Sequence, residues 1–267
     1  MNHMDTTIDI GWFELIVSHL LLIIPLLIFW YYKTKLLKDT IIAMLRMSVQ
    51  LILVGFYLEY VFRWNNAYIN LLWVLIMVIV SAVTITQKTG LKLRFFLVPN
   101  FVAIFVSLFV IDFLFLGYIV KLDYAFDARY IIPISGMILG NSMQNNIISL
   151  NYMYNDLNKN EIQYQYALAC GASFKEAITP YISEGLRKSF NPTIAKTAVM
   201  GIISLPGTMT GQIIGGSSPT TAIKYQIMLV LMIFVSSVLS VFLSIVIANR
   251  FAFDKYFNLR KEIFVKK

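Results

Sequence analysis

The chain alternates between long apolar stretches and short polar segments, and the apolar stretches are longer than those of ordinary core helices. A helix needs about 20 apolar residues to cross the hydrocarbon core of a bilayer, and most of the stretches reach that length. Inside lipid the backbone must form its hydrogen bonds internally, so such uninterrupted runs predict helices rather than strands. The predicted spans are Trp12–Tyr32, Ile41–Phe62, Ala67–Thr86, Phe95–Val120, Tyr130–Met153, Pro192–Ile214 and Ile223–Ala248.

The composition supports a membrane protein. Apolar residues make up 58% of the 267 positions and charged residues only 13%, whereas a soluble domain carries about 45–50% and about 25%. This balance excludes a soluble globular protein and a disordered chain. We therefore expect an all-α integral membrane protein with about seven transmembrane helices in one domain, residues 1–267.

The net charge of +8 would suggest a nucleic-acid partner in a soluble protein, but here it matches the predicted topology, and no nucleic acid is expected. Cytoplasmic loops of membrane proteins carry an excess of Lys and Arg. With the N-terminus outside and the C-terminus in the cytoplasm, the outer segments hold only Arg63, Lys121, Arg129 and Lys224. The inner segments hold Lys33, Lys35, Lys38, Lys88, Lys92, Arg94, Lys159, Lys175, Arg187, Lys188, Arg250, Lys255, Arg260, Lys261, Lys266 and Lys267.

One predicted inner loop, residues 154–191, is much longer than a connection between two spans requires. Its Ala-rich stretch around Ala167 favours helix, Gly171 interrupts that stretch, and Pro180 and Pro192 punctuate the residues after it. We expect two short helices joined near Gly171 on the cytoplasmic side. Since the loop is not needed to cross the bilayer, it is a candidate docking element for a cytoplasmic partner.

Charged and amide side chains inside the second and fourth predicted spans are the first candidates for function. Arg46 and Gln50 stand four residues apart on one helix face. Arg46 lies about one turn from the inner boundary, so it either anchors the helix end at the headgroups or faces a pathway. Asp112 lies deep in an apolar run and must pair with another helix or stay neutral.

The fifth and sixth predicted spans are the least lipid-like. In the fifth, the spacing of Gly136 and Gly140 allows close helix approach, and the amides after them, from Asn141 to Asn146, predict a cavity lining. In the sixth, Ser204 and Thr208 share a face with glycines, and Pro206 removes one helical hydrogen bond. Such a break is tolerated where protein or a water-filled cavity satisfies the freed group, so we expect a broken helix beside a translocation path, the alternative being a kinked packing helix.

Catalytic alternatives find no support in the sequence. The chain has no G-x-x-x-x-G-K-[ST] motif with which to bind ATP and no H-E-x-x-H or Cys-pair metal motif. Its two histidines, His3 and His19, are too few for a His-rich metal site, and the single Cys170 allows no internal disulfide. The chain is therefore expected not to be an enzyme.

The sixth predicted span and the residues after it, Ser204 to Ile227, resemble the signature of the iron-export ABC transporter permeases of the FetB type, which are related to plant aluminium-tolerance permeases. Weaker matches are Arg46–Gly55, Gly140–Met143 and Ala167–Ala172. The chain departs from the family pattern at Thr208, where the family usually has Met, and at Gln165, where the loop of bacterial ABC importers has Glu.

The resemblance implies a permease domain in the cell membrane that pairs with a second copy and with two cytoplasmic P-loop ATPase subunits. ATP and Mg would be used by those partners, and this chain would bind no cofactor. The implied cargo is iron moved outward, or another metal ion, with Glu59, Asp112, Asn141, Met143, Met209 and Gln212 as weak, transient ligands of mixed hardness. No metal-binding set is assigned.

The candidate residues therefore form two groups. Those for the substrate pathway are Arg46, Gln50, Asp112, Asn141, Met143, Ser204, Pro206, Thr208, Met209 and Gln212; those for ATPase coupling are Ala167, Gly171 and Ala172. The alternative function is a gradient-driven secondary transporter or channel with Asp112 as the protonatable group, although no inverted repeat is visible between the two halves. A membrane scaffold is the third possibility, and the insertion cost of the polar spans argues against it.

Overall fold

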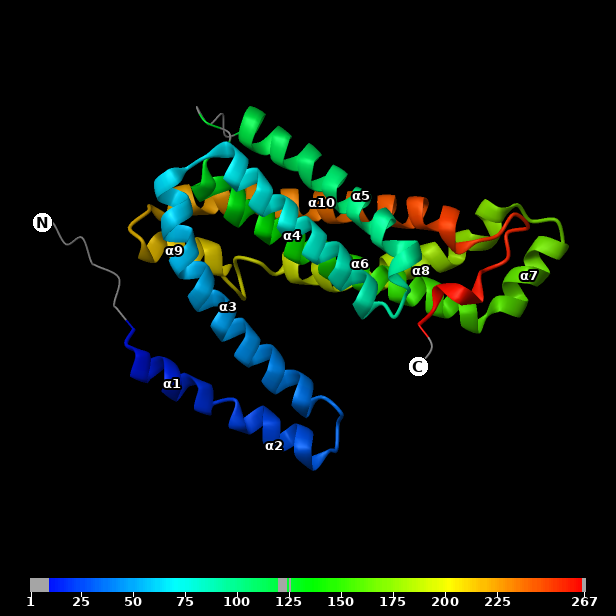
Figure 1. The fold of residues 1–267 in the computed structure, drawn as a ribbon, viewed down its shortest axis with the longest axis horizontal. Coiled ribbons are helices and arrows are strands. Elements are labelled where there is room, and N and C mark those ends of the chain that lie inside the picture. Colours follow the sequence, from blue (N-terminus) through cyan, green and yellow to red (C-terminus); the bar gives the residue numbers. More distant parts are fainter. Residues whose placement is uncertain (1–9, 120–123, 125, 266–267) are drawn as a thin grey trace, which may run out of the picture.

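The computed structural model describes residues 10–119, 124 and 126–265, and in these residues the chain is built from helices (Figure 1). Among the residues named above, His3, Val120, Lys121, Lys266 and Lys267 lie outside the described ranges. The helices are α1 (Trp12–Leu20), α2 (Ile23–Tyr31), α3 (Leu37–Trp64), α4 (Ala67–Lys88), α5 (Leu93–Asp112), a π-helix (Phe113–Ile119), α6 (Ala128–Lys159), α7 (Glu161–Ala169), α8 (Phe174–Ala198), α9 (Gly207–Ile214), α10 (Pro219–Ala252) and a 3₁₀ turn (Lys261–Ile263).

Five helical stretches in the described residues are long and apolar enough to cross a membrane: 12–31, 37–64, 67–88, 93–115 and 219–252. They coincide with five of the predicted spans, because a continuous apolar run specifies a buried or lipid-facing helix directly. The fifth predicted span is also helical, within α6, whose 32 residues extend for about 48 Å at 1.5 Å per residue. An all-helical membrane protein is thus confirmed.

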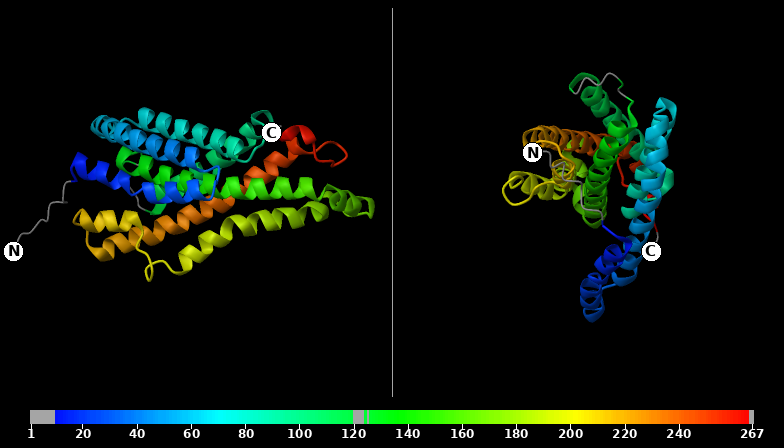
Figure 2. Two further views of the ribbon diagram at one scale, coloured as in Figure 1. Left: turned by 90° about the horizontal axis from the view of Figure 1, so that it is seen from below. Right: turned by 90° about the vertical axis from the view of Figure 1, so that its left-hand side faces the viewer.

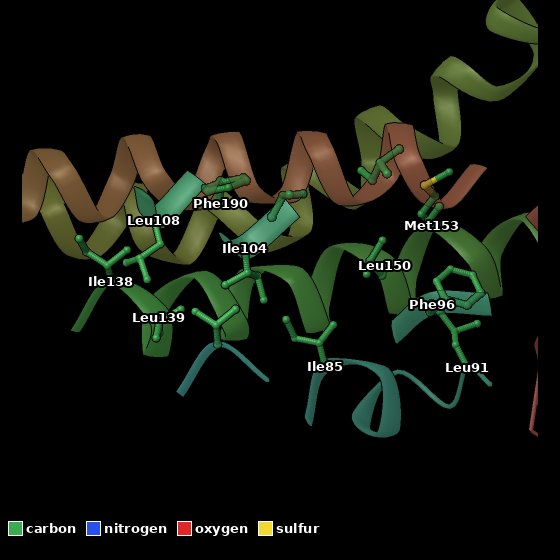
Figure 3. Packing of buried hydrophobic residues seen from close by; sticks show 14 of the residues in the cluster. Ile85, Leu91, Phe96, Ile104, Leu108, Ile138, Leu139, Leu150, Met153 and Phe190 are labelled. Atoms are coloured by element: carbon green, nitrogen blue, oxygen red, sulfur yellow. The ribbon is translucent and has the colours of Figure 1, made fainter. Parts of the chain in front are cut away.

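The core of the molecule lies between α4, α5, α6 and α10 (Figure 3). The long α10 packs against both α5 and α6, and α4 packs against the same two helices. Ile85, Ile104 and Leu150 from three of these helices are almost completely buried. Helix α8 covers a further face of α6, so α6 has neighbours on several sides.

Side-chain caps fix where three of the core helices, α4, α6 and α10, begin. Asn66 accepts a hydrogen bond from the amide of Tyr68 at 2.9 Å before α4, and Asp127 accepts one from the amide of Arg129 at 3.0 Å before α6. Ser218 caps α10, with Pro219 at the first helical position. These residues satisfy amides that have no partner within their own helix.

Helices α1, α2 and α3 form an arm that diverges from the core bundle (Figures 1 and 2). Within α1 and α2 no residue is buried, and in α3 only Val61 is buried. The C-terminal half of α3 contacts α4 through the rings of Tyr57 and Trp73, whose centroids are 4.5 Å apart. His19 Nε2 and Ser48 Oγ, 2.9 Å apart, link α1 to the middle of α3.

The loop predicted over residues 154–191 has different boundaries in the structure. Helix α6 continues to Lys159, and α8 is a 25-residue helix rather than a short one. Pro180, expected to punctuate this loop, and Pro192, expected to begin the next span, both lie inside α8. Tertiary packing against α6 overrides the local cost of the two prolines. The turn predicted at Gly171 is present, between α7 and α8.

The connections gather at the two ends of the molecule in alternation. The α4–α5 turn, α7 and the C-terminal segment lie at one end, and the α3–α4 turn, the start of α6 and α9 lie at the other (Figures 1 and 2). This arrangement agrees with the alternating loops assumed from the Lys and Arg pattern. Which end faces the cytoplasm stays a prediction.

Candidate functional site

The sixth predicted span is a broken helix rather than a continuous one. Helix α8 ends at Ala198, α9 begins at Gly207, and the chain between them is unwound. Gly201 has a φ of +88°, and its amide donates to the carbonyl of Ser204 at 3.0 Å. Pro206 is the N-cap of α9. The predicted break in this span is present, but it begins before Pro206: α8 ends at Ala198, and the chain then turns at the left-handed Gly201.

Helix α9 is fastened to α10 by side chains from its first turn. The Thr208 hydroxyl donates a hydrogen bond to Oε1 of Gln226, and Met209 is buried. Gly216, just after the helix, has a φ of +91°, and the amide of Ser217 donates to the carbonyl of Gln212 at 2.9 Å. This backbone geometry is a Schellman C-cap, which supplies a partner for a carbonyl that the helix leaves free.

The ten candidate pathway residues lie in four places rather than one. Two are on the arm, one is at the end of α5, two are in α6, and the remaining five belong to the break and α9. Asp112 and Met209 are buried, and Met143, Pro206 and Gln212 are partly buried. The exposed ones are Arg46, Gln50, Asn141, Ser204 and Thr208.

Asp112 lies at the junction of α5 and the π-helix, buried between helices. Its Oδ2 accepts a hydrogen bond of 2.7 Å from the hydroxyl of Ser135 on α6, and its Oδ1 has no partner among the described residues. Pairing with a second helix, one of the two outcomes expected for this carboxyl, is thus present. π-Helical segments are uncommon and are often found at functional sites.

Ser142 and the amide of Asn146 lie at a helix interface rather than in a cavity, whereas Asn141 and Gln144 are exposed. Ser142 and Asn146 face α10, where their side chains bond Ser237 at 3.3 Å and Ser240 at 2.8 Å. The serines of α10 were missed from the sequence, although their spacing would place them on one helix face. Asn141 points away from this interface and donates to the carbonyl of Met137 at 2.8 Å.

The predicted coupling residues form the turn between α7 and α8. Gly171 has a φ of +97°, and the amide of Ala172 donates to the carbonyl of Ala167 at 3.1 Å. The amide of Gly171 donates to Leu168 at 3.0 Å, which completes a Schellman C-cap. The glycine at position 171 thus has a local structural explanation, because a side chain there would strain the left-handed backbone.

Capping and burial fix the two helices on either side of this turn. Ser173 and Glu176 form a capping box at the start of α8, and the Ser173 hydroxyl and amide hold the pKa of Glu176 below its usual value. In α7, the pKa of Tyr164 is raised to about 12, mainly by burial and to a smaller extent by the negative charge of Asp254. Tyr164 therefore stays neutral and donates its proton in a hydrogen bond.

Polar residues of the arm lie on exposed helix surface. Arg46, Gln50 and Glu59 are all exposed on α3. Neither they nor the other described residues form a cluster of three or more His, Cys, Asp or Glu side chains that could hold a metal ion. A preformed, carboxylate-rich metal centre is therefore not a feature of the described part of this chain.

Several apolar helices of membrane-crossing length, together with a broken helix, define a multi-pass membrane protein. The chain belongs to the family described as Uncharacterised protein family (UPF0014), whose model matches residues 12–253. It is 32% identical to the "Probable iron export permease protein FetB" of Escherichia coli (strain K12) over 94% of each chain.

Two further relatives extend the comparison. The chain is 30% identical to the "UPF0014 membrane protein YjkA" of Bacillus subtilis (strain 168), over 94% of this chain and 97% of the relative. It is also 30% identical to the protein "ALUMINUM SENSITIVE 3" of Arabidopsis thaliana, over 85% and 81% respectively. No solved structure shows significant similarity to the chain.

Proposed function

We propose that this chain is the membrane-spanning permease subunit of an ABC transporter in the cell membrane, which exports iron or another metal ion. ATP would be hydrolysed on a separate cytoplasmic P-loop ATPase, since the chain has no such motif of its own. The observation that carries the proposal is the α7–α8 element, which consists of α7, the turn at Gly171 and the start of α8 at Phe174. This element projects from one end of the bundle (Figure 1).

The outer face of α7 is suited to contact a protein partner. Ile162 is 83% exposed and Tyr166 is 71% exposed, while Tyr164 on the opposite face is 1% exposed. At a membrane-distal end these apolar groups face water, unlike the exposed apolar residues of the spans, which lipid covers. Docking of the ATPase on α7 and the adjoining turn would remove them from water and press on the permease.

The broken α8–α9 helix supports a transport role. Helix breaks at membrane depth are found where backbone groups line a cavity or a pathway, and discontinuous helices form the substrate sites of many transporters. Helix α8 begins at the α7–α8 turn and ends at the break. A movement of the docking turn therefore reaches the break through a single helix.

A second copy of the chain would cover the exposed polar face of the arm. Arg46 and Gln50 are exposed on a helix of membrane-crossing length, where contact with lipid is costly for both. Pairing of two copies through this region would enclose these groups between protomers. The homodimer expected from the family resemblance is thus compatible with a specific surface, centred on α3.

The cargo is proposed from the relatives and from the available donors. One relative is named for iron export and another for aluminium sensitivity. The candidate donors mix carboxylate and amide oxygens with thioethers, and they are dispersed over α3, α5, α6 and α9. Such a dispersed set favours brief contacts during passage over tight binding.

The test is metal transport by the purified chain in liposomes, with and without its ATPase. We expect ATP-dependent movement of iron only when both subunits are present. Transport by the chain alone, driven by a proton gradient and lost in Asp112→Asn, would instead establish the secondary-transporter alternative, which the buried Asp112 carboxyl favours.

Docking is tested by co-purification of the two subunits. Gly171→Ala places a side chain on a left-handed backbone, whereas Cys170→Ala changes the preceding exposed residue at a φ of −78°. We expect Gly171→Ala to weaken association with the ATPase and Cys170→Ala to leave it unchanged. Equal association of both variants would contradict docking at this turn.

A further inference from the structure

The segment after α10, residues 253–265, folds back on itself as a compact C-terminal hook. Asp254 Oδ1 accepts hydrogen bonds from the amides of Tyr256 and Asn258, both at 2.8 Å. The amide of Arg260 donates to the carbonyl of Ala252 at 2.9 Å, which closes the loop onto the end of α10. The hook is therefore a defined structure rather than a loose extension.

The hook pairs with the α4–α5 turn through its backbone. The amide of Lys92 donates to the carbonyl of Ile263 at 2.8 Å, and the amide of Val265 donates to the carbonyl of Gly90 at 2.9 Å. The side chain of Ile263 is fully buried, and that of Leu91 is 2% exposed. Two backbone bonds, with a buried apolar side chain on each segment, thus join the end of α10 to the start of α5.

The same hook also holds α7 and the start of α8. The hydroxyl of Tyr164 donates to the carbonyl of Phe257 at 2.7 Å. The ring of Phe174 lies against those of Phe253 and Phe257, with centroids 5.0 and 4.9 Å apart. An exposed ion pair from Lys261 to Glu161 at 3.3 Å adds little, since water screens it.

We propose that the C-terminal hook positions the α7–α8 element and joins it mechanically to α4, α5 and α10, so that these parts move together when an ATPase acts on the turn. The inference rests on the proposed function. Among the helices, α7 contacts α6 and α8. The hook adds a connection from α7 to the other side of the bundle, and Tyr164 is its positioning residue.

The first experiment removes one hydroxyl. Tyr164→Phe loses the hydrogen bond to Phe257 and keeps the buried ring, while Tyr256→Phe changes a tyrosine of the hook that is 81% exposed. We expect Tyr164→Phe to lower the metal transported per ATP hydrolysed by about 2- to 10-fold, as loss of one hydrogen bond allows, with ATPase association retained. Tyr256→Phe should keep the wild-type ratio, and a wild-type ratio in Tyr164→Phe overturns the role of this residue.

The second experiment detaches the hook from the α4–α5 turn. Ile263→Asp introduces a charge at a fully buried position, and Val265→Asp introduces the same charge at a side chain that is 52% exposed. We expect Ile263→Asp to hydrolyse ATP with little transport and Val265→Asp to transport normally. Thermal stability is measured for both, and if Ile263→Asp does not fold, the result from Tyr164→Phe decides.

The third experiment asks whether the hook stays attached during transport. Leu91 and Phe264 form an antiparallel bridge in a pair without mutual hydrogen bonds, where Cα atoms are about 4.5 Å apart, within disulfide range. With Cys170→Ser as background, Leu91→Cys with Phe264→Cys should cross-link and retain transport. Loss of transport on oxidation that is recovered on reduction would show that the hook must release, and would overturn the proposal.

The proposed function and the inference fail differently. If the wild-type chain neither binds an ATPase nor transports with ATP, the proposed function fails and the inference falls with it. If the wild-type complex transports normally, and the Tyr164→Phe and Ile263→Asp variants transport as much metal per ATP hydrolysed as the wild type, only the inference fails.

Discussion

Gly185 holds α8 close to α6, and its replacement provides a graded test of this contact. A Cβ atom placed on Gly185 would lie 2.9 Å from the backbone oxygen of Ser149 and 3.3 Å from Cβ of Met153. Neither atom can turn aside, because one is backbone and the other is fixed to it. Gly185→Ala must therefore push α8 away from α6.

The magnitude depends on two opposing effects. Alanine in place of glycine favours a helix by about 1 kcal/mol, and overpacking a tight contact costs about 1–3 kcal/mol. Gly140→Ala is the matched control on α6, since a Cβ there meets no atom within 4 Å. Because both variants share the helix gain, the difference between them isolates the packing cost, about 1–3 kcal/mol in favour of Gly140→Ala.

A third glycine completes the series. A Cβ on Gly136 would lie 3.3 Å from Cε of Met77, the flexible end of a side chain that can move. Unfolding of each purified variant in detergent should therefore rank their stabilities with Gly140→Ala first, Gly136→Ala next and Gly185→Ala last. Equal stability of Gly185→Ala and Gly140→Ala would refute the close approach of α6 and α8.

Three further predictions concern single polar contacts. Ser173→Ala should destabilise the start of α8 by about 0.5–2 kcal/mol. Because the pKa of Glu176 is lowered in the folded protein, the contribution of Glu176 to stability is complete above its unfolded pKa and is lost as the pH falls through its folded pKa. Thermal unfolding measured over a pH series checks this dependence. Thr208→Val should leave the buried Gln226 without its partner, at about 1–3 kcal/mol, and speed hydrogen exchange in α9. Asp112→Asn should fold as stably as the wild type and transport at least about tenfold less metal, a difference of roughly 1.4 kcal/mol in activation free energy.

Long apolar runs predicted most of the helices, because helices that face lipid or the protein core need apolar side chains. Over residues 192–214 the prediction was wrong in position, because it started the span at Pro192 and placed the break at Pro206. Pro192 is inside α8, which packs on α6, while the helix breaks earlier than Pro206, at the left-handed Gly201. Helix packing and backbone handedness decided the outcome, and neither is visible in an apolar pattern.

The candidate site was predicted only in part, for a similar reason. Gly171 was found because a glycine that interrupts a helix-forming run marks a turn. Ser240 was missed because the spacing of the α10 serines, which places them on one helix face, does not reveal their partner, Asn146. The hook was missed because its main ties, such as that between Lys92 and Ile263, join backbone atoms and do not depend on side-chain type.

The polar groups inside the bundle and those at its surface call for different explanations. The Ser142 hydroxyl and Nδ2 of Asn146 bond to serines of α10, so these groups are satisfied between helices, whereas Oδ1 of Asn146 has no partner among the described residues. Arg46, Gln50 and Ser204 are exposed at membrane-length or broken helices, where lipid offers them no partners. A pathway or a second copy of the chain would satisfy them, which directs the search for the proposed transport route toward α3 and the α8–α9 break.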